Sequence, residues 1–187
     1  MTEIRVQNLC KTYGDHVVLR NLSFTAGVGV TRILGRSGAG KTTLLRILLG
    51  LDQPDSGGLF GTNCRWAAVF QEDRLLGHLD AEDNLRFALG SAYNAAAAKA
   101  LLGELGLADV GSKPICEYSG GMKRRLALAR ALLAPSDALI LDEPFTGLDE
   151  ENRSIALRCI LHAAQTKPVL LASHEALDLP NCKEVRL

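Results

Sequence analysis

Hydrophobic residues follow two different patterns along the chain. Residues 4–9 and 17–24 alternate or cluster apolar side chains on either side of the turn-prone residues 13–15, as half-exposed antiparallel strands do. Short apolar runs, typical of parallel strands buried on both faces, occur at residues 30–34, 138–141 and 169–172. The pattern predicts an α/β protein with a mixed β-sheet flanked by helices and an antiparallel β N-terminal portion.

A helical pattern occupies the middle of the chain. Asp80 is suited to cap a helix that begins at Ala81, and residues 91–105 include four consecutive alanines, which are strong helix formers. We therefore expect a single domain in which a small inserted α-helical subdomain, residues 79–118, interrupts an α/β core made of residues 1–78 and 119–187.

Two shorter signals lie before this helical region. The glycine-rich residues 57–61 predict a turn or short hairpin between strands. Residues 67–70 are apolar and precede Gln71, so we expect a strand that places Gln71 at its end.

Composition narrows the possible functions. The 187 residues, of which 47% are hydrophobic, suffice for one buried core, and the formal net charge is zero. No Lys/Arg block resembles the basic footprint of a nucleic-acid-binding protein, so we expect no nucleic acid partner. The five cysteines lack a C-x-x-C pair, which argues against a disulfide framework or a zinc site. No signal peptide or long apolar stretch is visible, so the chain is not expected to cross a membrane by itself.

The most specific motif lies between the apolar pair Ile33-Leu34 and a helix-like segment that begins at Thr43. It fits the phosphate-binding loop G-x-x-x-x-G-K-[ST] of P-loop NTPases, whose backbone N–H groups and following helix N-terminus face phosphate oxygens. Lys41 would reach the outer phosphates and the Thr42 hydroxyl would bind Mg²⁺. The predicted nucleotide-binding residues here are Gly35, Arg36, Ser37, Gly38, Ala39, Gly40, Lys41, Thr42 and Thr43.

Two later strands are expected to end in side chains suited to phosphate chemistry. The run 138–141 is followed by Asp142 and Glu143, at the carboxyl end of a strand where ligands of open α/β sheets bind. Asp142 would hold Mg²⁺, and Glu143 could polarise the water that attacks the γ-phosphate. His174 follows the run 169–172 and could contact the γ-phosphate.

A further motif resembles a known family. Tyr118-Ser119-Gly120-Gly121-Met122 and the helix-like segment after it are similar to the signature motif of ATP-binding cassette (ABC) ATPases. Ser119, Gly120 and Gly121 at a helix N-terminus would form a second phosphate site. The resemblance extends over nearly the whole chain, because the phosphate loop corresponds to Walker A, and Asp142 with Glu143 to Walker B.

The same resemblance implies roles for the remaining motif residues. Tyr13 corresponds to the aromatic residue that stacks on adenine, although it also fits a turn position without ligand contact. Gln71 corresponds to the Q-loop and Asp149 to the D-loop. The implied cofactors are ATP and Mg²⁺; the implied metal ligands are Thr42, Gln71 and Asp142, and the implied catalytic residues are Glu143, His174 and Gln71.

Transport through a separate membrane protein follows from the resemblance. It implies an ATP-hydrolysing subunit of an ABC transporter, acting as a homodimer in which the signature of one subunit closes over ATP on the other. It also implies an integral membrane permease that docks near residues 72–79, an extracytoplasmic solute-binding protein, and a cytoplasmic location on the inner face of the membrane. Met122 and the sequences around Gln71 and Asp142 are similar to the nitrate, sulfonate and taurine-type importer branch, whereas Tyr118 replaces the usual leucine.

Three other classes of nucleotide-binding protein are alternatives to a transporter subunit. A soluble, non-transport ABC ATPase would normally carry tandem cassettes, coiled-coil arms or basic extensions, which this sequence lacks. A P-loop small-molecule kinase would use the helical insert as a substrate lid but needs neither residues 119–121 nor His174. A GTPase would need an N-K-x-D motif to recognise guanine, and this sequence contains none.

Overall fold

The computed structural model describes residues 2–174 and 182–187, which form two β-sheets with helices packed between the sheets and against the parallel sheet. The strands are β1 (Ile4–Tyr13), β2 (His16–Ala26), β3 (Gly29–Leu34), β4 (Ser56–Phe60), β5 (Trp66–Val69), β6 (Ala138–Asp142), β7 (Pro168–Ala172) and β8 (Lys183–Arg186). The helices are α1 (Lys41–Leu48), α2 (Ala81–Leu89), α3 (Ala95–Glu104), α4 (Gly120–Leu133) and α5 (Glu150–Ala164), with short 3-10 helices η1 (Gly90–Ala92) and η2 (Ile115–Glu117).

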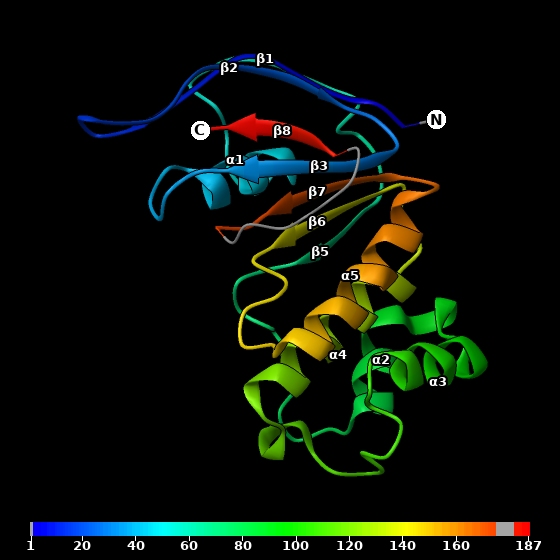
Figure 1. The fold of residues 1–187 in the computed structure, drawn as a ribbon. Coiled ribbons are helices and arrows are strands. Elements are labelled where there is room, and N and C mark those ends of the chain that lie inside the picture. The colour runs from blue at the N-terminus through cyan, green and yellow to red at the C-terminus, as the bar shows by residue number, and fades with distance from the viewer. Residues whose placement is uncertain (1, 175–181) are drawn as a thin grey trace.

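The antiparallel and parallel strands form separate sheets. The order is β2-β1-β4 in an antiparallel sheet and β5-β6-β7-β3-β8 in a five-stranded sheet whose pairs are all parallel. In Figure 1 the antiparallel sheet and α1 lie on one side of the parallel strands, while α4 and α5 lie on the other. The expected α/β fold with antiparallel N-terminal strands is confirmed, and the two kinds of pairing are divided between two sheets.

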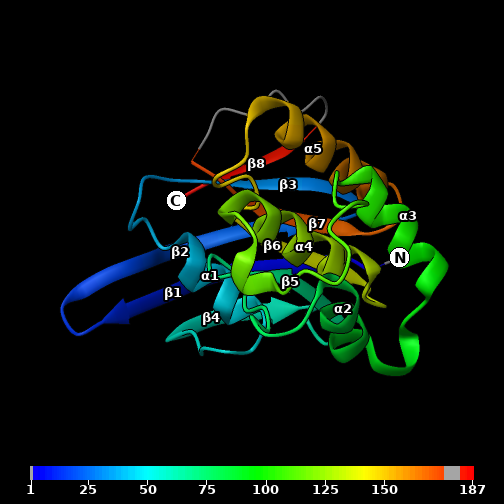
Figure 2. The same ribbon diagram turned by 90° about the horizontal axis from the view of Figure 1, so that it is seen from below.

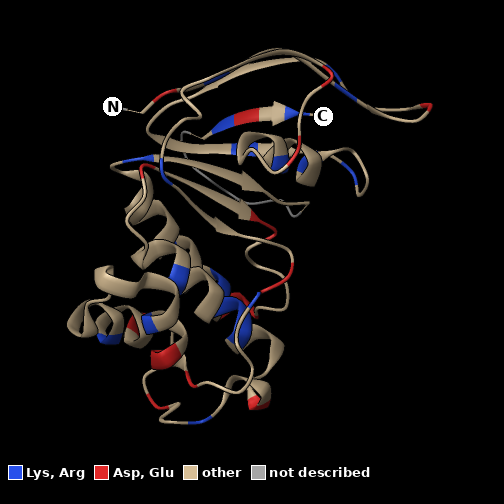
Figure 3. Cartoon of the chain, turned by 180° about the vertical axis from the view of Figure 1, so that it is seen from behind, with Lys and Arg blue, Asp and Glu red and all other residues tan. Residues whose placement is uncertain are grey.

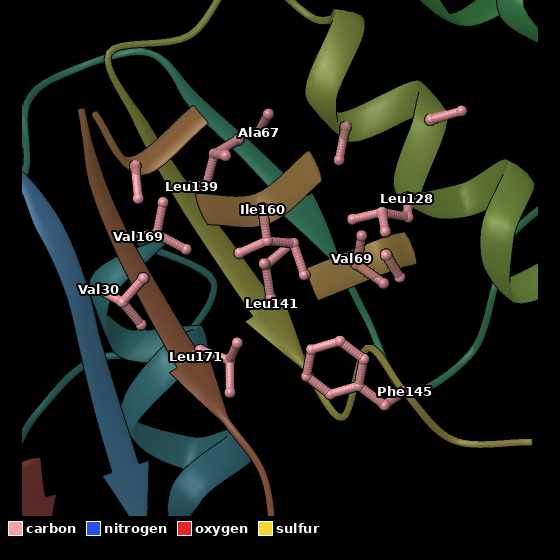
Figure 4. Packing of buried hydrophobic residues seen from close by; sticks show 14 of the residues in the cluster. Val30, Ala67, Val69, Leu128, Leu139, Leu141, Phe145, Ile160, Val169 and Leu171 are labelled. Carbon is pink, nitrogen blue, oxygen red and sulfur yellow. The ribbon is translucent and has the colours of Figure 1, made fainter. Parts of the chain in front are cut away.

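Alternate residues of the parallel strands enter two different hydrophobic cores. Leu139, Leu141, Val169 and Leu171 pack with α4 and α5 (Figure 4). Their neighbours Ile140 and Leu170 point to the opposite face and pack with α1 and the antiparallel sheet. Because successive strand residues face opposite sides, a run that is buried on both faces must be apolar throughout, which explains the unbroken runs in the sequence.

Helix α4 connects the parallel sheet to the inserted helices. Leu128 and Ala129 belong to the core beneath the sheet, whereas Leu126 packs in a third cluster with residues of α2, α3 and η2. Figure 2 shows α2 and α3 beside α4, toward one end of the molecule. Asp80 caps α2 by accepting a hydrogen bond of 2.9 Å from the Asp83 N–H, as the sequence predicted.

Two local predictions were wrong in detail. Residues 57–61 do not form a turn or hairpin of their own, because residues 56–60 are strand β4, paired with β1. The helix expected over residues 91–105 begins only at Ala95, because Asn94 has extended backbone angles and its side chain caps α3.

The surface carries mixed charge. Figure 3 shows Lys and Arg as well as Asp and Glu on both strands and helices. Within residues 2–174 and 182–187, no helix has the length and apolar character needed to cross a membrane.

Candidate functional site

The glycine-rich loop between β3 and α1 forms the base of the candidate site. Gly40 is the N-cap of α1 and has a φ of 97°, in the region that favours glycine. A Cβ at this position would lie 2.6 Å from Val18 Cγ1 and 3.1 Å from the Val18 carbonyl. Glycine thus lets the loop lie directly against β2 while the N-terminus of α1 opens toward the site, an arrangement suited to an anion.

Lys41 places a buried positive charge at this helix N-terminus. Its Nζ donates hydrogen bonds to the carbonyls of Gly35 (2.8 Å) and Arg36 (3.3 Å) and lies 3.8 Å from Glu143 Oε1. A buried ammonium group needs such acceptors. The Lys41 ammonium group therefore contacts both the glycine-rich loop and Glu143, the residue that follows β6.

Thr42 and Asp142 bring together two oxygen groups from distant segments. The Thr42 hydroxyl donates a 2.8 Å hydrogen bond to Asp142 Oδ2. Burial raises the pKa of the Asp142 carboxyl, and Glu143 acts in the same direction, while the Thr42 hydrogen bond and the charges of Lys41 and Arg124 oppose this. A hydroxyl and a buried carboxylate are the oxygen ligands that Mg²⁺ prefers, and bound Mg²⁺ would favour the ionised carboxylate, so the donor set fits this ion.

Glu143 and His174 form a second polar pair at the same edge of the parallel sheet. His174 Nδ1 lies 2.9 Å from Glu143 Oε2, and the His174 backbone N–H lies 3.3 Å from the same oxygen. Glu143 has a φ of 51°, an uncommon conformation for a residue other than glycine. Its carboxylate lies between Lys41 and His174, 3.8 Å from Lys41 Nζ and 2.9 Å from His174 Nδ1.

A cavity of about 320 Å³ collects most of the predicted residues. Its lining comprises Tyr13, His16, Val18, Ser37, Gly38, Gly40, Lys41, Thr42, Thr43, Gln71, Asp142 and Glu143. His16 and Val18 were missed by the sequence reasoning. The signal was available for His16, because a hairpin that turns at residues 14–15 pairs Tyr13 with His16.

Tyr13 is held at this cavity by a polar cluster. Its hydroxyl donates to Asp52 Oδ2, and Lys11 Nζ lies 3.2 Å from Asp52 Oδ1 and 4.9 Å from the centre of the Tyr13 ring. The hydrogen bond to Asp52 raises the pKa of the Tyr13 hydroxyl. The ring therefore has a defined place beside the loop although about half of Tyr13 is exposed.

The residues of the predicted signature lie outside this cavity. Ser119 caps α4, since its Oγ accepts a hydrogen bond of 3.3 Å from the Met122 N–H, and both Ser119 and Gly120 are exposed. Asp149, the predicted D-loop residue, also lies outside the cavity lining and caps α5 by accepting a 2.8 Å hydrogen bond from the Asn152 N–H. One chain thus carries a lined phosphate-loop cavity and a separate exposed helix N-terminus.

Gly121 explains why the signature and the residues before Asp149 meet. A Cβ at Gly121 would lie 2.9 Å from the carbonyl oxygen of Gly147 and 3.5 Å from Leu148 Cδ2. The helix N-terminus therefore packs directly against the Gly147 backbone and the Leu148 side chain of the same chain.

Comparison with known protein families identifies the family of this chain. A family model described as "ABC transporter" matches residues 19–146. The chain belongs to the ABC transporter family. Within it, the chain is an ATP-binding ATPase component.

Several ABC proteins illustrate the relationship. An "Aliphatic sulfonates import ATP-binding protein SsuB" of Corynebacterium glutamicum is 39% identical over 181 residues, covering 92% of this chain and 74% of the relative. A "Nod factor export ATP-binding protein I" of Cupriavidus metallidurans is 39% identical over 191 residues, covering 91% of this chain and 62% of the relative.

A solved ABC structure has the same fold. A putative ABC transporter ATP-binding protein from Pyrococcus furiosus superimposes with a TM-score of 0.89 at 24% identity, covering 99% of this chain and 97% of the other.

Proposed function

We propose that this ABC ATPase binds ATP together with Mg²⁺ at the phosphate-loop cavity and powers import of a solute through a separate integral membrane permease. The observation that carries the proposal is the meeting of Lys41, the Thr42–Asp142 pair and the Glu143–His174 pair beside one glycine-rich loop. Import is proposed because relatives such as the sulfonate protein of Corynebacterium glutamicum are named as importers.

Binding would depend mainly on the loop and α1. Backbone N–H groups of residues 35–40 and the N-terminus of α1 would face the phosphates, with Lys41 exchanging its carbonyl partners for phosphate oxygens. Tyr13 would contact the adenine. Thr42, Asp142 and Gln71 would hold Mg²⁺, which neutralises charge on the phosphate oxygens.

Hydrolysis would depend on the Glu143–His174 pair. The Glu143 carboxylate would accept a proton from the attacking water, and His174, hydrogen-bonded to that carboxylate, would orient it and contact the γ-phosphate. Gln71 would complete this group from the end of β5.

A homodimer would complete each site. Ser119, Gly120 and Gly121 lie outside the cavity and point a capped helix N-terminus outward, so they can serve phosphate on a second copy of the chain. Asp149 would lie near the same junction, because Gly147 contacts Gly121. We propose that residues 79–118 and the core, residues 1–78 and 119–187, act as two subdomains during closure.

The permease would dock beside Gln71. A cavity of about 500 Å³ adjoins Phe70 and is lined by β5, α2 and the segment between them, with Phe87 74% exposed at its edge. An exposed aromatic at a groove is suited to a protein partner. The assembly would lie on the cytoplasmic face of the membrane and receive its cargo from an extracytoplasmic solute-binding protein.

Complementation between two inactive variants tests the two-chain site. Ser119→Arg blocks the proposed phosphate site at the N-terminus of α4 but leaves the phosphate loop intact. Lys41→Ala disables the phosphate loop but leaves the N-terminus of α4 intact. Each variant alone should lack hydrolysis, and a mixture should recover activity because the mixed dimer keeps one complete site. Ser91→Arg, at another exposed serine, is the control and should hydrolyse ATP normally.

The result also separates this proposal from a kinase-like P-loop enzyme with a single-chain site. A Ser119→Arg protein as active as the parent, with no effect of mixing, would refute the two-chain site.

A further inference from the structure

Helix α4 carries a buried charge that none of the roles above uses. Arg124 is only 5% exposed. Its Nη1 donates a 2.6 Å hydrogen bond to the carbonyl of Phe70, and its Nη2 donates a 2.6 Å hydrogen bond to the carbonyl of Gln71. Nη1 also lies 3.2 Å from Asp73 Oδ1, an ion pair without hydrogen-bond alignment. One guanidinium group thus contacts three residues of the segment 70–73, namely Phe70, Gln71 and Asp73.

The geometry of these contacts is specific to arginine. Two carbonyls and a carboxylate are reached by the planar fork of one guanidinium group, which lysine cannot reproduce because its ammonium is a single point. A charge this deeply buried persists only where its partners compensate for lost hydration. The segment is therefore fixed to α4 at the residue that also lines the phosphate-loop cavity.

A second arginine of α4 supports the adjacent residues and provides a comparison. Arg130 donates hydrogen bonds of 2.6 Å to the carbonyl of Arg74 and 2.8 Å to the carbonyl of Asp73. The Gln71 carbonyl accepts its hydrogen bond from Arg124 and not from Arg130. The part of the segment next to the cavity therefore depends on Arg124.

We infer that Arg124 is a positioning residue that holds the Gln71 backbone on α4 and so sets where Gln71 lies beside the phosphate-loop cavity. The inference rests on the proposed role of Gln71 in holding Mg²⁺.

The test compares Arg124→Gln with Arg130→Gln in the full chain. Both substitutions remove a guanidinium group from α4, but only the first releases the Gln71 carbonyl. Hydrogen exchange measured without nucleotide should be faster across residues 68–73 in Arg124→Gln than in the parent. The Mg²⁺ concentration for half-maximal ATP hydrolysis should rise by about 10-fold or more, as is typical when a residue that orients a metal ligand is lost.

Two further readouts distinguish positioning from general loosening. ATP binding in the presence of EDTA should stay close to that of the parent, because Arg124 does not contact the phosphate loop. Arg130→Gln should keep the parental Mg²⁺ dependence, and Arg124→Lys should restore the charge but not the Mg²⁺ dependence. If Arg124→Gln does not fold, the Asp73→Asn/Arg124→Gln double variant removes the partly buried Asp73 carboxylate together with its partner, and the same shift in Mg²⁺ dependence is expected.

The inference is overturned if a folded Arg124 variant keeps the parental exchange and Mg²⁺ dependence, or if Arg130→Gln shifts both equally. An inactive parent protein would refute the proposed function instead, while hydrogen exchange would still decide whether Arg124 holds the segment at Gln71.

Discussion

Glu143 combines an uncommon backbone conformation with side-chain contacts to Lys41 and His174. Its φ of 51° is a form of backbone strain that occurs at functional sites and is maintained by the surrounding structure. Its carboxylate lies between Lys41 and His174. A hydrogen bond of 2.9 Å from the Glu143 N–H to the Ala172 carbonyl ties this residue to β7. The backbone at Glu143 is therefore fixed to β7, while its carboxylate lies beside Lys41 and His174.

Glu143→Gln should retain ATP binding and lose turnover by roughly 10²-fold or more, because the amide cannot accept a proton as a carboxylate does. Phosphate release measured under single-turnover conditions, together with an ATP affinity measurement, checks both parts. Lys41→Ala is the contrasting variant and should lose ATP binding, since it removes the buried cation beside the loop. Near-normal hydrolysis by Glu143→Gln would remove Glu143 from the catalytic role.

Tyr118 shows how the chain accommodates its departure from the usual signature leucine. Its ring packs in the cluster formed by α2, α3, η2 and α4. Its hydroxyl is buried and has no hydrogen-bond partner among the described residues, and burial raises its pKa. The ring thus fills an apolar position at the cost of an unsatisfied polar atom.

Tyr118→Phe should therefore raise the free energy of unfolding by about 1 kcal/mol, because it removes a buried unsatisfied hydroxyl while keeping the ring. Urea unfolding measures the change. Tyr93→Phe is the matched control, since the Tyr93 hydroxyl donates a 3.0 Å hydrogen bond to Glu82 and its loss should not stabilise the protein. A less stable Tyr118→Phe protein would show that the hydroxyl has a partner, such as water.

At the scale of elements, α4 is the central piece because it joins three parts of the molecule. Its middle packs under the parallel sheet, its flank packs on the inserted helices, and Arg124 holds the segment after β5. Its first two residues illustrate different constraints. A Cβ at Gly120 would meet nothing within 4 Å, whereas one at Gly121 would lie 2.9 Å from the Gly147 carbonyl.

Gly121→Ala should destabilise the folded chain, because backbone of the 147–149 segment or the N-terminus of α4 must shift. Gly120→Ala should leave stability unchanged or raise it by up to about 1 kcal/mol, since alanine favours helix. Thermal unfolding of the two variants at equal concentration gives the comparison. Equal melting temperatures would contradict the close packing of Gly121 against Gly147.

For the whole molecule, the proposed two-chain site has a kinetic consequence. If Ser119 acts on ATP held by another chain, hydrolysis should rise more steeply than linearly with protein concentration while monomers predominate, because only dimers carry complete sites. Initial rates measured over a wide range of concentrations, with sedimentation to follow dimers, test this expectation. Strictly linear dependence would favour one active site within one chain.

Local motifs made much of this protein predictable from its sequence. The loop at residues 35–42, Asp142 and Glu143, and Ser119 with its glycines could be identified because phosphate, metal and helix-capping chemistry require particular residues at fixed spacing. The buried strands were also predicted, because the apolar runs exceed what a half-exposed strand carries. The roles assigned to these residues stay predictions.

Long-range contacts decided the rest. Residues 57–61 suggested a turn because glycine is common there, but a Cβ at Gly57 would lie 2.7 Å from the Asn8 carbonyl, so its glycine serves the close approach of β4 to β1. Likewise, the links from Tyr13 to Asp52, from Arg124 to Gln71 and from Gly121 to Gly147 join segments far apart in the chain. The sequence by itself determined which motifs and local elements the chain contains, because each is encoded by residues that are close together in the chain. Only the tertiary structure decided which groups meet, because those contacts arise from strand register and helix packing.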